Sequence, residues 1–138
     1  MTVDTDRLQA RLLSMRQLIG HLEGIGPVTA ERLSDDFGLR LQVERALSQV
    51  VTLATEINLH VVSRELTRPP ADLRESFEEM VEAGWLSEEL AGRLKDSPGL
   101  RNVLVHEYVR IDLTIVASAV PMAVDGFGEY VRAIASRL

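Results

Sequence analysis

The hydrophobic positions of this chain recur every three or four residues along almost its whole length. Between residues 6 and 23 the apolar residues form one stripe, with arginines opposite them: Leu8, Leu12, Met15, Ile19 and Leu22. This spacing is that of an amphipathic helix. The stretch Gly24–Pro27 then predicts a break, because glycine and proline interrupt a helical pattern.

A longer helical pattern covers residues 28–66. Its apolar stripe consists of Leu47, Val50, Val51, Ala54, Ile57, Val61 and Val62. Phe37 and Gly38 interrupt its early part, and the proline pair at 69–70 ends it, because the residue before a proline avoids helical geometry. An acidic helix from Ala71 or Asp72 to Gly84 follows, and its predicted inner face is Leu73, Phe77, Met80 and Val81.

Three further helix starts are marked by capping residues. Ser87 precedes two glutamates, Ser97 precedes a proline, and Asp112 precedes the last apolar segment. These are the residue types that N-caps and first helical turns favour. Pro121 predicts a kink in the last helix. The whole chain, residues 1–138, is therefore predicted to be one all-α domain, a bundle of about five helices with short connections.

The composition excludes several kinds of site. The chain has no cysteine, which rules out disulfides, thiol catalysis and cysteine-based metal sites. Its three histidines lie far apart in sequence, so neither a metal nor a cofactor is expected. No apolar run reaches the length of a membrane span. Residues 1–4 lead directly into a charged helical pattern rather than a signal peptide, so the expected location is the cytoplasm.

The charge balance is acidic, with a formal net charge of −6 and a pI near 5.1. A protein that coats nucleic acid is usually basic, so any contact with nucleic acid must be made at a local site. The only lysine is Lys95. Arginine suits phosphate recognition, but coding bias explains this preference for arginine better.

Residues 99–112 carry the most informative chemistry. A helix advances by about 100° per residue, which places Tyr108 at about −20°, Asn102 at about 100° and His106 at about 140° from Arg101. Arginine offers a fork of donors to phosphate oxygens, histidine passes protons near neutral pH, and asparagine can orient either group. This combination suits cleavage of RNA, whose 2′-hydroxyl can attack its own phosphate. An arginine and a histidine at this spacing also occur as ordinary packing or surface residues.

The string Leu-Arg-Asn-Val-Leu-Val-His-Glu-Tyr at residues 100–108 resembles the Arg-x4-His-x-Tyr signature of the HepT toxins, which belong to the HEPN superfamily. Residues 45–60 resemble the long second helix of that family, in which an acidic residue precedes a histidine by four, here Glu56 and His60. The acidic helix after Pro70, together with the segment Glu82–Leu86 at its end, also resembles that family in its position. The resemblance covers the chain from about residue 40 and, more weakly, the first helix.

The resemblance implies a helical homodimer that cleaves RNA without a metal, in a cleft where the motifs of the two chains face each other. Arg101 and His106 would be catalytic, with Asn102 and Tyr108 in support. It also implies an MntA-like nucleotidyltransferase antitoxin, which would transfer AMP to Tyr108. Glu56 and His60 can pair at a spacing of four residues, either on the helix surface or dimer seam, or as support for the cleft.

A second hypothesis is a non-catalytic helical dimer that binds a nucleotidyltransferase or a nucleotide as a scaffold. A third is an adaptor that makes no contact with RNA. Arg101, His106 and Tyr108 together favour the ribonuclease hypothesis, because a scaffold does not need this combination of side chains.

Overall fold

A computed structural model describes residues 2–106 and 110–138 of the chain, and every regular element within these ranges is helical. The elements are α1 (Thr5–Ile25), α2 (Ala30–Asp35), α3 (Phe37–Glu65), α4 (Leu73–Glu82), α5 (Glu88–Leu94), α6 (Ser97–His106), α7 (Leu113–Met122), the π-helical segment η1 (Ala123–Phe127) and α8 (Gly128–Ala135). The predicted all-α class is confirmed.

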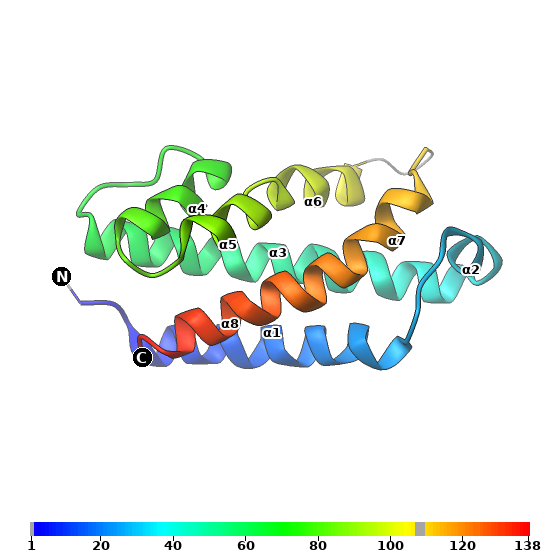
Figure 1. The fold of residues 1–138 in the computed structure, drawn as a ribbon, viewed down its shortest axis with the longest axis horizontal. Helices are drawn as coiled ribbons and strands as arrows, with labels where there is room; N and C mark the ends of the chain where they lie inside the picture. Colours follow the sequence, from blue (N-terminus) through cyan, green and yellow to red (C-terminus); the bar gives the residue numbers. More distant parts are fainter. Residues whose placement is uncertain (1, 107–109) are drawn as a thin grey trace.

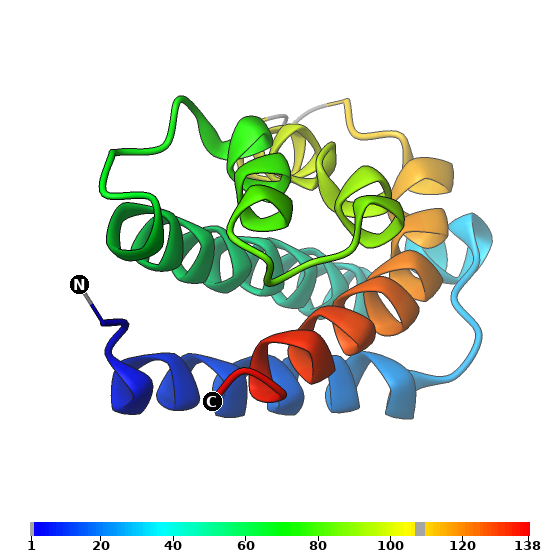
Figure 2. The same ribbon diagram turned by 60° about the vertical axis from the view of Figure 1, so that its left-hand side comes forward.

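The bundle is arranged around α3. Helix α1 lies antiparallel beside α3, and the continuous run of α7, η1 and α8 crosses both (Figures 1 and 2). Helices α4 and α6 pack on another side of α3, joined by α5, which also contacts η1. The stripe predicted for residues 6–23 is buried against this arrangement, from Leu8 to Leu22. No described helix is both long enough and apolar enough to pass through a bilayer.

Capping side chains fix most of the helix boundaries that the sequence predicts. The side chain of Asp72 accepts a hydrogen bond from Glu75 N, that of Ser87 from Leu90 N, and that of Asp112 from Thr114 N. Each bond satisfies an N–H group that the first helical turn leaves without an intrahelical partner. Gly84 follows α4 with φ of 83°, a conformation that glycine adopts without strain.

Two predicted boundaries differ in detail. The long pattern of residues 28–66 is divided at Asp36, whose carboxylate accepts a hydrogen bond from Leu39 N at 3.0 Å and starts α3. The helix predicted to start at Ser97 does begin there, as α6. The prediction that Ser97 is its N-cap is wrong. Ser97 is the first residue of α6, and its hydroxyl donates to the carbonyl of Leu94 at 2.6 Å. That bond ties α6 to the end of α5.

The last helix changes its hydrogen-bond register instead of simply kinking. Pro121 lies near the end of α7, and the π-helical segment η1 begins two residues later, at Ala123. Proline has no N–H to donate, so the regular ladder is interrupted there. Gly126 sits against Leu94 so closely that a Cβ atom would lie 2.9 Å from Leu94 Cδ2. A larger residue at this position would therefore force the Leu94 side chain to shift.

Two side chains of α4 differ from expectation in how far they are buried. Leu73, expected on the inner face, begins the helix and is 38% exposed, because it borders a hollow shared with Val51 and Pro98. Glu79, one of the residues that make this helix acidic, is only 8% exposed. Its Oε1 accepts a hydrogen bond from Ala71 N at 3.2 Å, and its Oε2 lies 3.7 Å from Arg68. Glu79 therefore holds the loop before α4 onto the bundle.

A buried polar network joins three helices. The Tyr130 hydroxyl of α8 lies 2.6 Å from Asn58 Oδ1 and 2.9 Å from the Ala54 carbonyl, both on α3. Asn58 Nδ2 donates to Ser76 Oγ of α4 at 3.1 Å, and Ser76 Oγ donates to the Leu73 carbonyl. Burial raises the pKa of Tyr130 well above its ordinary value, so the phenol stays protonated and donates.

Tyr130→Phe should lower the free energy of unfolding by about 1–3 kcal/mol, because it leaves buried acceptors on α3 without their donor. Urea denaturation at neutral pH measures the loss. Ser136→Ala is the control, since it removes an exposed hydroxyl that bonds only to Ala133 of its own helix. A Tyr130→Phe protein as stable as the Ser136→Ala protein would show that the network contributes nothing to stability.

Candidate functional site

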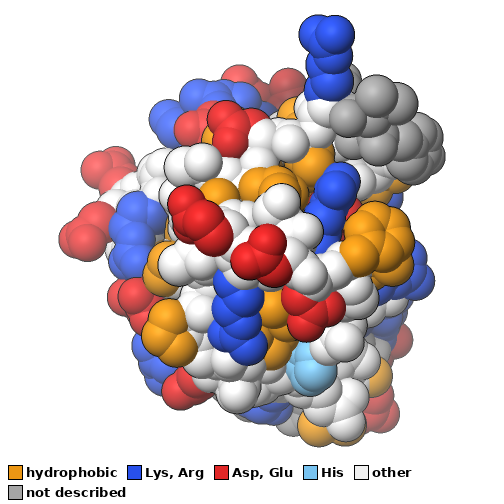
Figure 3. Space-filling view, turned by 90° about the vertical axis from the view of Figure 1, so that its right-hand side faces the viewer, with side chains coloured by type: hydrophobic (Ala, Val, Ile, Leu, Met, Phe, Trp, Pro, Cys, Tyr) orange, Lys and Arg blue, Asp and Glu red, His pale blue; other side chains and the backbone are white. Residues whose placement is uncertain are grey.

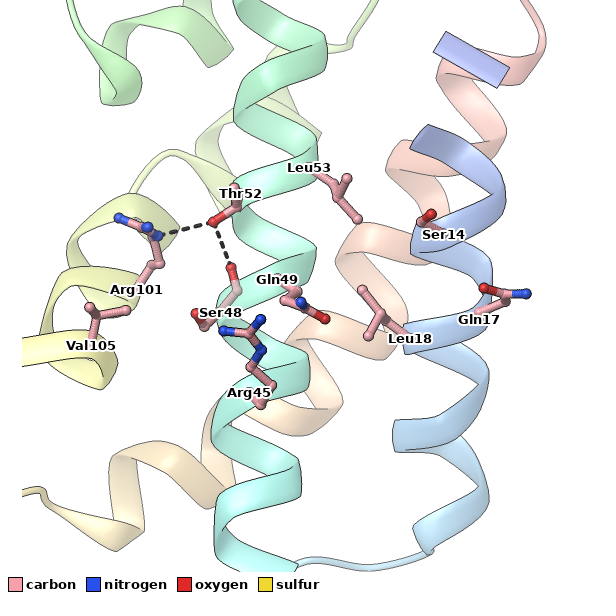
Figure 4. A pocket seen from close by; sticks show the side chains of 10 residues that line it. All are labelled: Ser14, Gln17, Leu18, Arg45, Ser48, Gln49, Thr52, Leu53, Arg101 and Val105. Carbon is pink, nitrogen blue, oxygen red and sulfur yellow. Dashed lines mark hydrogen bonds between the residues drawn. The ribbon is translucent and has the colours of Figure 1, made fainter. Parts of the chain in front are cut away.

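Arg101 lies in the middle of α6 and is half-buried, with its side chain directed toward α3 (Figure 4). Its Nε donates a hydrogen bond to Thr52 Oγ1 at 3.0 Å. The same hydroxyl donates to the Ser48 carbonyl at 3.0 Å. Thr52 thus links the guanidinium to the backbone of α3. The bond engages Nε alone, so the two terminal nitrogens of the guanidinium are not needed to hold it in place.

Arg101 forms part of a pocket with a volume of about 590 Å³. Three helices build its wall: α3 forms the floor, and α6 and α1 stand on either side (Figure 4). The lining residues are Ser14, Gln17 and Leu18 from α1, Arg45, Ser48, Gln49, Thr52 and Leu53 from α3, and Arg101 and Val105 from α6. The volume is within the range of small-molecule sites, about 300–1,000 Å³.

The other predicted residues of α6 do not line this pocket. Asn102 and His106 are exposed, and neither belongs to its wall. Leu104 is buried and anchors α6 on the bundle, which turns Arg101, one turn earlier, toward α3. Within this helix, Arg101 therefore faces the pocket, whereas Asn102 and His106 face away from it. Tyr108 lies outside the residues that the structure describes.

The predicted pair of Glu56 and His60 is wrong. Glu56 Oε2 accepts a hydrogen bond from Arg11 Nε of α1 at 3.0 Å, while His60 Nε2 accepts one from Asp4 N at 2.9 Å. Both residues line another hollow, of about 380 Å³, together with Arg7, Arg11, Leu59, Ser63 and Arg64. Each residue thus bonds to a group distant in sequence, Glu56 to the Arg11 side chain of α1 and His60 to the backbone N–H of Asp4.

Burial is the largest cause that lowers the pKa of His60 below its ordinary value, followed by the positive charges of Arg64 and Arg7. The ring is therefore kept neutral, as its role as acceptor from Asp4 N requires. Glu56 and His60 hold the N-terminal end of α1 against α3, and neither contributes to the wall of the Arg101 pocket.

Of the ten lining residues, the sequence analysis singled out only Arg101, and the two missed residues that matter most to its chemistry are Thr52 and Arg45. Both lie on the polar side of α3, opposite the apolar stripe, at a spacing of seven residues. Such a side normally faces solvent, so helical periodicity alone gives it no function. The spacing does place both residues on one face of the helix, and α6 brings Arg101 to that same face.

The pocket is positively charged. Its wall includes Arg45 and Arg101 but no aspartate or glutamate. The ion pairs within 4.0 Å among the described residues involve neither of these arginines. By contrast, acidic and basic side chains alternate over the end of the molecule where α2 lies (Figure 3). The described residues contain no cluster of three or more His, Asp or Glu that could hold a metal ion.

Comparisons with known proteins give a consistent result. The family model described as "Ribonuclease HepT-like" matches residues 15–134. The tRNA nuclease HepT of Aphanizomenon flos-aquae is 32% identical over 131 residues, which are 95% of this chain and 89% of that protein. The mRNA nuclease HepT of Shewanella oneidensis is 26% identical over 103 residues, 75% of this chain and 77% of that protein.

A solved structure of similar fold is that of a tri-AMPylated HEPN toxin of Shewanella oneidensis in complex with an MNT antitoxin. The TM-score is 0.83 at 22% sequence identity, and the match covers 95% of this chain and 98% of that one. At this identity the likeness establishes the fold. The family match spans most of the chain, and the Aphanizomenon relative is 32% identical over nearly all of it, so the chain belongs to the HepT-like ribonuclease family.

Proposed function

We propose that this chain is the toxin of a toxin–antitoxin pair and that it is an RNA endonuclease. The observation that carries the proposal is Arg101, which is held by Thr52 at the edge of a positively charged pocket without carboxylates. In a member of the HepT-like ribonuclease family, such a pocket suits an RNA phosphate. The nuclease names of both HepT relatives point to the same substrate class.

The reaction is an attack of the ribose 2′-oxygen on the adjacent phosphorus. A bond forms between the 2′-oxygen and phosphorus, the bond from phosphorus to the 5′-oxygen breaks, and a 2′,3′-cyclic phosphate and a 5′-hydroxyl result. His106 takes the proton of the 2′-hydroxyl and returns a proton to the leaving 5′-oxygen. Arg101 donates to the phosphate oxygens, whose negative charge grows in the five-coordinate transition state. Asn102, exposed beside His106, supports its orientation.

The proposed active enzyme is a symmetric homodimer, since one chain does not hold a complete site. His106 is exposed and lies outside the wall of the Arg101 pocket. A second copy packed over α6 would provide the opposite wall and bring its motif to face that of the first chain. Val103, 42% exposed on the same helix, supplies apolar surface for this contact. A stable interface should bury more than about 1,000 Å² in total.

The proposed partner is an MntA-like nucleotidyltransferase that inactivates the toxin. Complexes of a HEPN toxin with an MNT antitoxin are known for a protein of this fold, and that toxin is AMPylated. In our proposal the Tyr108 phenol oxygen attacks the α-phosphorus of ATP, pyrophosphate leaves and the phenolic proton is released. The added phosphate carries about one negative charge, which competes with RNA for the arginines.

Arg101→Ala should lower kcat for RNA cleavage by about 10²–10³-fold, because it removes the group that stabilises the charge on phosphorus. His106→Ala should lower it by about 10²–10⁴-fold through loss of proton transfer. Expression of either variant without the antitoxin should no longer slow growth. Cleavage of a fluorescent RNA by purified protein gives the rates, and light scattering should show that both variants remain dimers.

An RNA with 2′-deoxyribose at the cleaved position is the control for the chemistry, since it lacks the nucleophile and should stay intact. A fully active His106→Ala enzyme would contradict the assignment of the base. A folded wild-type dimer that binds its nucleotidyltransferase but cuts no RNA would favour the scaffold hypothesis instead.

Thr52 is a positioning residue for Arg101, and paired substitutions test this role. Thr52→Val keeps the shape of the side chain but removes the hydroxyl that accepts from Arg101, so kcat should fall about tenfold. Thr52→Ser keeps the hydroxyl and should retain most of the activity. Urea denaturation of both variants separates loss of stability from loss of function. Equal activity of the two variants would show that the hydrogen bond does not position Arg101.

Tyr108→Phe should resist the antitoxin, because it removes the oxygen that accepts AMP. Wild-type toxin co-expressed with the nucleotidyltransferase should gain the mass of one or more adenylyl groups and lose RNA cleavage. The variant should keep its unmodified mass and its toxicity under the same conditions. Intact-mass spectrometry makes the comparison. Adenylyl groups that persist on Tyr108→Phe would place the modification on another residue.

A further inference from the structure

The floor of the pocket contains a second guanidinium, that of Arg45. Arg45 is exposed on α3, about two helical turns from Thr52, and lines the same pocket (Figure 4). With the Gln49 amide oriented so that both side chains are satisfied, Gln49 Oε1 accepts hydrogen bonds from Arg45 Nε at 3.2 Å and Nη2 at 3.0 Å. Gln49 thus orients the guanidinium without neutralising its charge.

Both arginines are held by neutral partners, Arg45 by Gln49 and Arg101 by Thr52. Elsewhere on the surface the described arginines often pair with carboxylates, as Arg11 does with Glu56 and Arg93 with Glu129. A carboxylate would neutralise the charge of a guanidinium and compete with an anionic ligand. A neutral oxygen fixes its direction and leaves the positive charge uncompensated, which is the arrangement that an anion site needs.

The rest of the pocket wall suits a nucleotide. Between the arginines lie Ser48 and Thr52, and α1 adds Ser14 and Gln17 on the far side. Hydroxyl and amide groups can bond to ribose hydroxyls and base edges, while Leu18 and Leu53 offer apolar contact. The pocket volume of about 590 Å³ is large enough for one nucleotide with its phosphate.

We propose that this pocket binds the RNA nucleotide next to the cleaved bond and that Arg45 binds its phosphate. The inference rests on the proposed function and adds a substrate-binding residue to it. Arg101 then contacts the phosphate that reacts, while Arg45 contacts its neighbour along the strand. Since the second phosphate does not change its charge during the reaction, Arg45 contributes to binding of substrate and transition state alike.

The test separates binding from cleavage. A single-stranded RNA carrying 2′-O-methyl groups lacks the nucleophile, so its affinity can be measured by fluorescence anisotropy without turnover. Arg45→Gln should bind this RNA about five- to tenfold more weakly, and the slope of log affinity against log salt should decrease by about 0.7 for one lost phosphate contact per strand. Cleavage of ordinary RNA should show a raised KM with kcat within about twofold of wild type.

Arg132→Gln is the matched control. Arg132 is an exposed arginine on α8, it is not part of the pocket wall, and no ion pair among the described residues involves it. Its variant loses the same formal charge and should bind RNA as wild type does. Arg45→Lys keeps the positive charge but lacks the planar guanidinium that can donate two hydrogen bonds to one phosphate. Its affinity for RNA should lie between those of the wild type and Arg45→Gln. Because Arg45 is exposed, its variants should melt at the temperature of the wild type.

The possible failures are distinguishable. If the wild type cuts RNA while Arg45→Gln keeps the affinity, salt slope and KM of the wild type, this inference is overturned and the ribonuclease function stands. If Arg45→Gln and Arg132→Gln weaken binding equally, the effect is one of overall charge and no nucleotide site exists at Arg45. If folded wild-type protein neither binds nor cuts RNA, the proposed function fails and the inference with it.

Discussion

Helix α3 has to serve as the centre of the bundle and as the floor of the site at the same time. Its apolar stripe is buried against α1, α4 and α7, and its polar side lies under the gap between α1 and α6. The two functions are compatible because residues adjacent in the sequence of a helix point in different directions. A residue such as Thr52 can therefore bond to Arg101 while its neighbour Val51 is buried in the core.

The position of α6 on α3 follows from packing rather than from polar contacts. Leu104 and Pro98 are buried on the bundle side of α6, and the Ser97 hydroxyl ties the start of α6 to α5. With α6 held at these points, the side chain of Arg101 reaches the Thr52 hydroxyl. Residues on the other side of α6, Asn102 and His106, are left exposed. The way α6 is anchored therefore explains why Arg101 faces the pocket while Asn102 and His106 do not.

Sequence patterns predicted the features that depend on nearby residues. The stripe of α1, the caps Asp72, Ser87 and Asp112, and the glycine ending α4 are decided by neighbours within one helical turn. The motif around Arg101 was found through a family resemblance, because a five-residue spacing by itself does not distinguish a site from a surface. Phe37 and Gly38 were identified as an interruption of the long pattern, but the N-cap role of Asp36, which divides the pattern there, was not.

The errors concern contacts between residues distant in sequence. Glu56 looked like a partner of His60, but Arg11, 45 residues away, offers it a full positive charge. Glu79 counted only as one acidic residue of its helix, but the loop before α4 folds back over it and donates a backbone N–H from Ala71. Arg45 belonged to a polar helix side that periodicity assigns to solvent. None of these partners can be inferred before the helices are placed next to one another.

An acidic protein that binds RNA must overcome the electrostatic repulsion between its net negative charge and the phosphates. With a net charge of −6, the chain repels a polyanion. Salt at physiological concentration screens this repulsion at distances beyond about 8–10 Å. Near the pocket the balance changes, because Arg45 and Arg101 have no carboxylate within 4.0 Å among the described residues. Affinity then depends on a small number of short, charge-assisted contacts. A site of this kind is sensitive to one added anion, which is why adenylylation near the motif would be an efficient means of control.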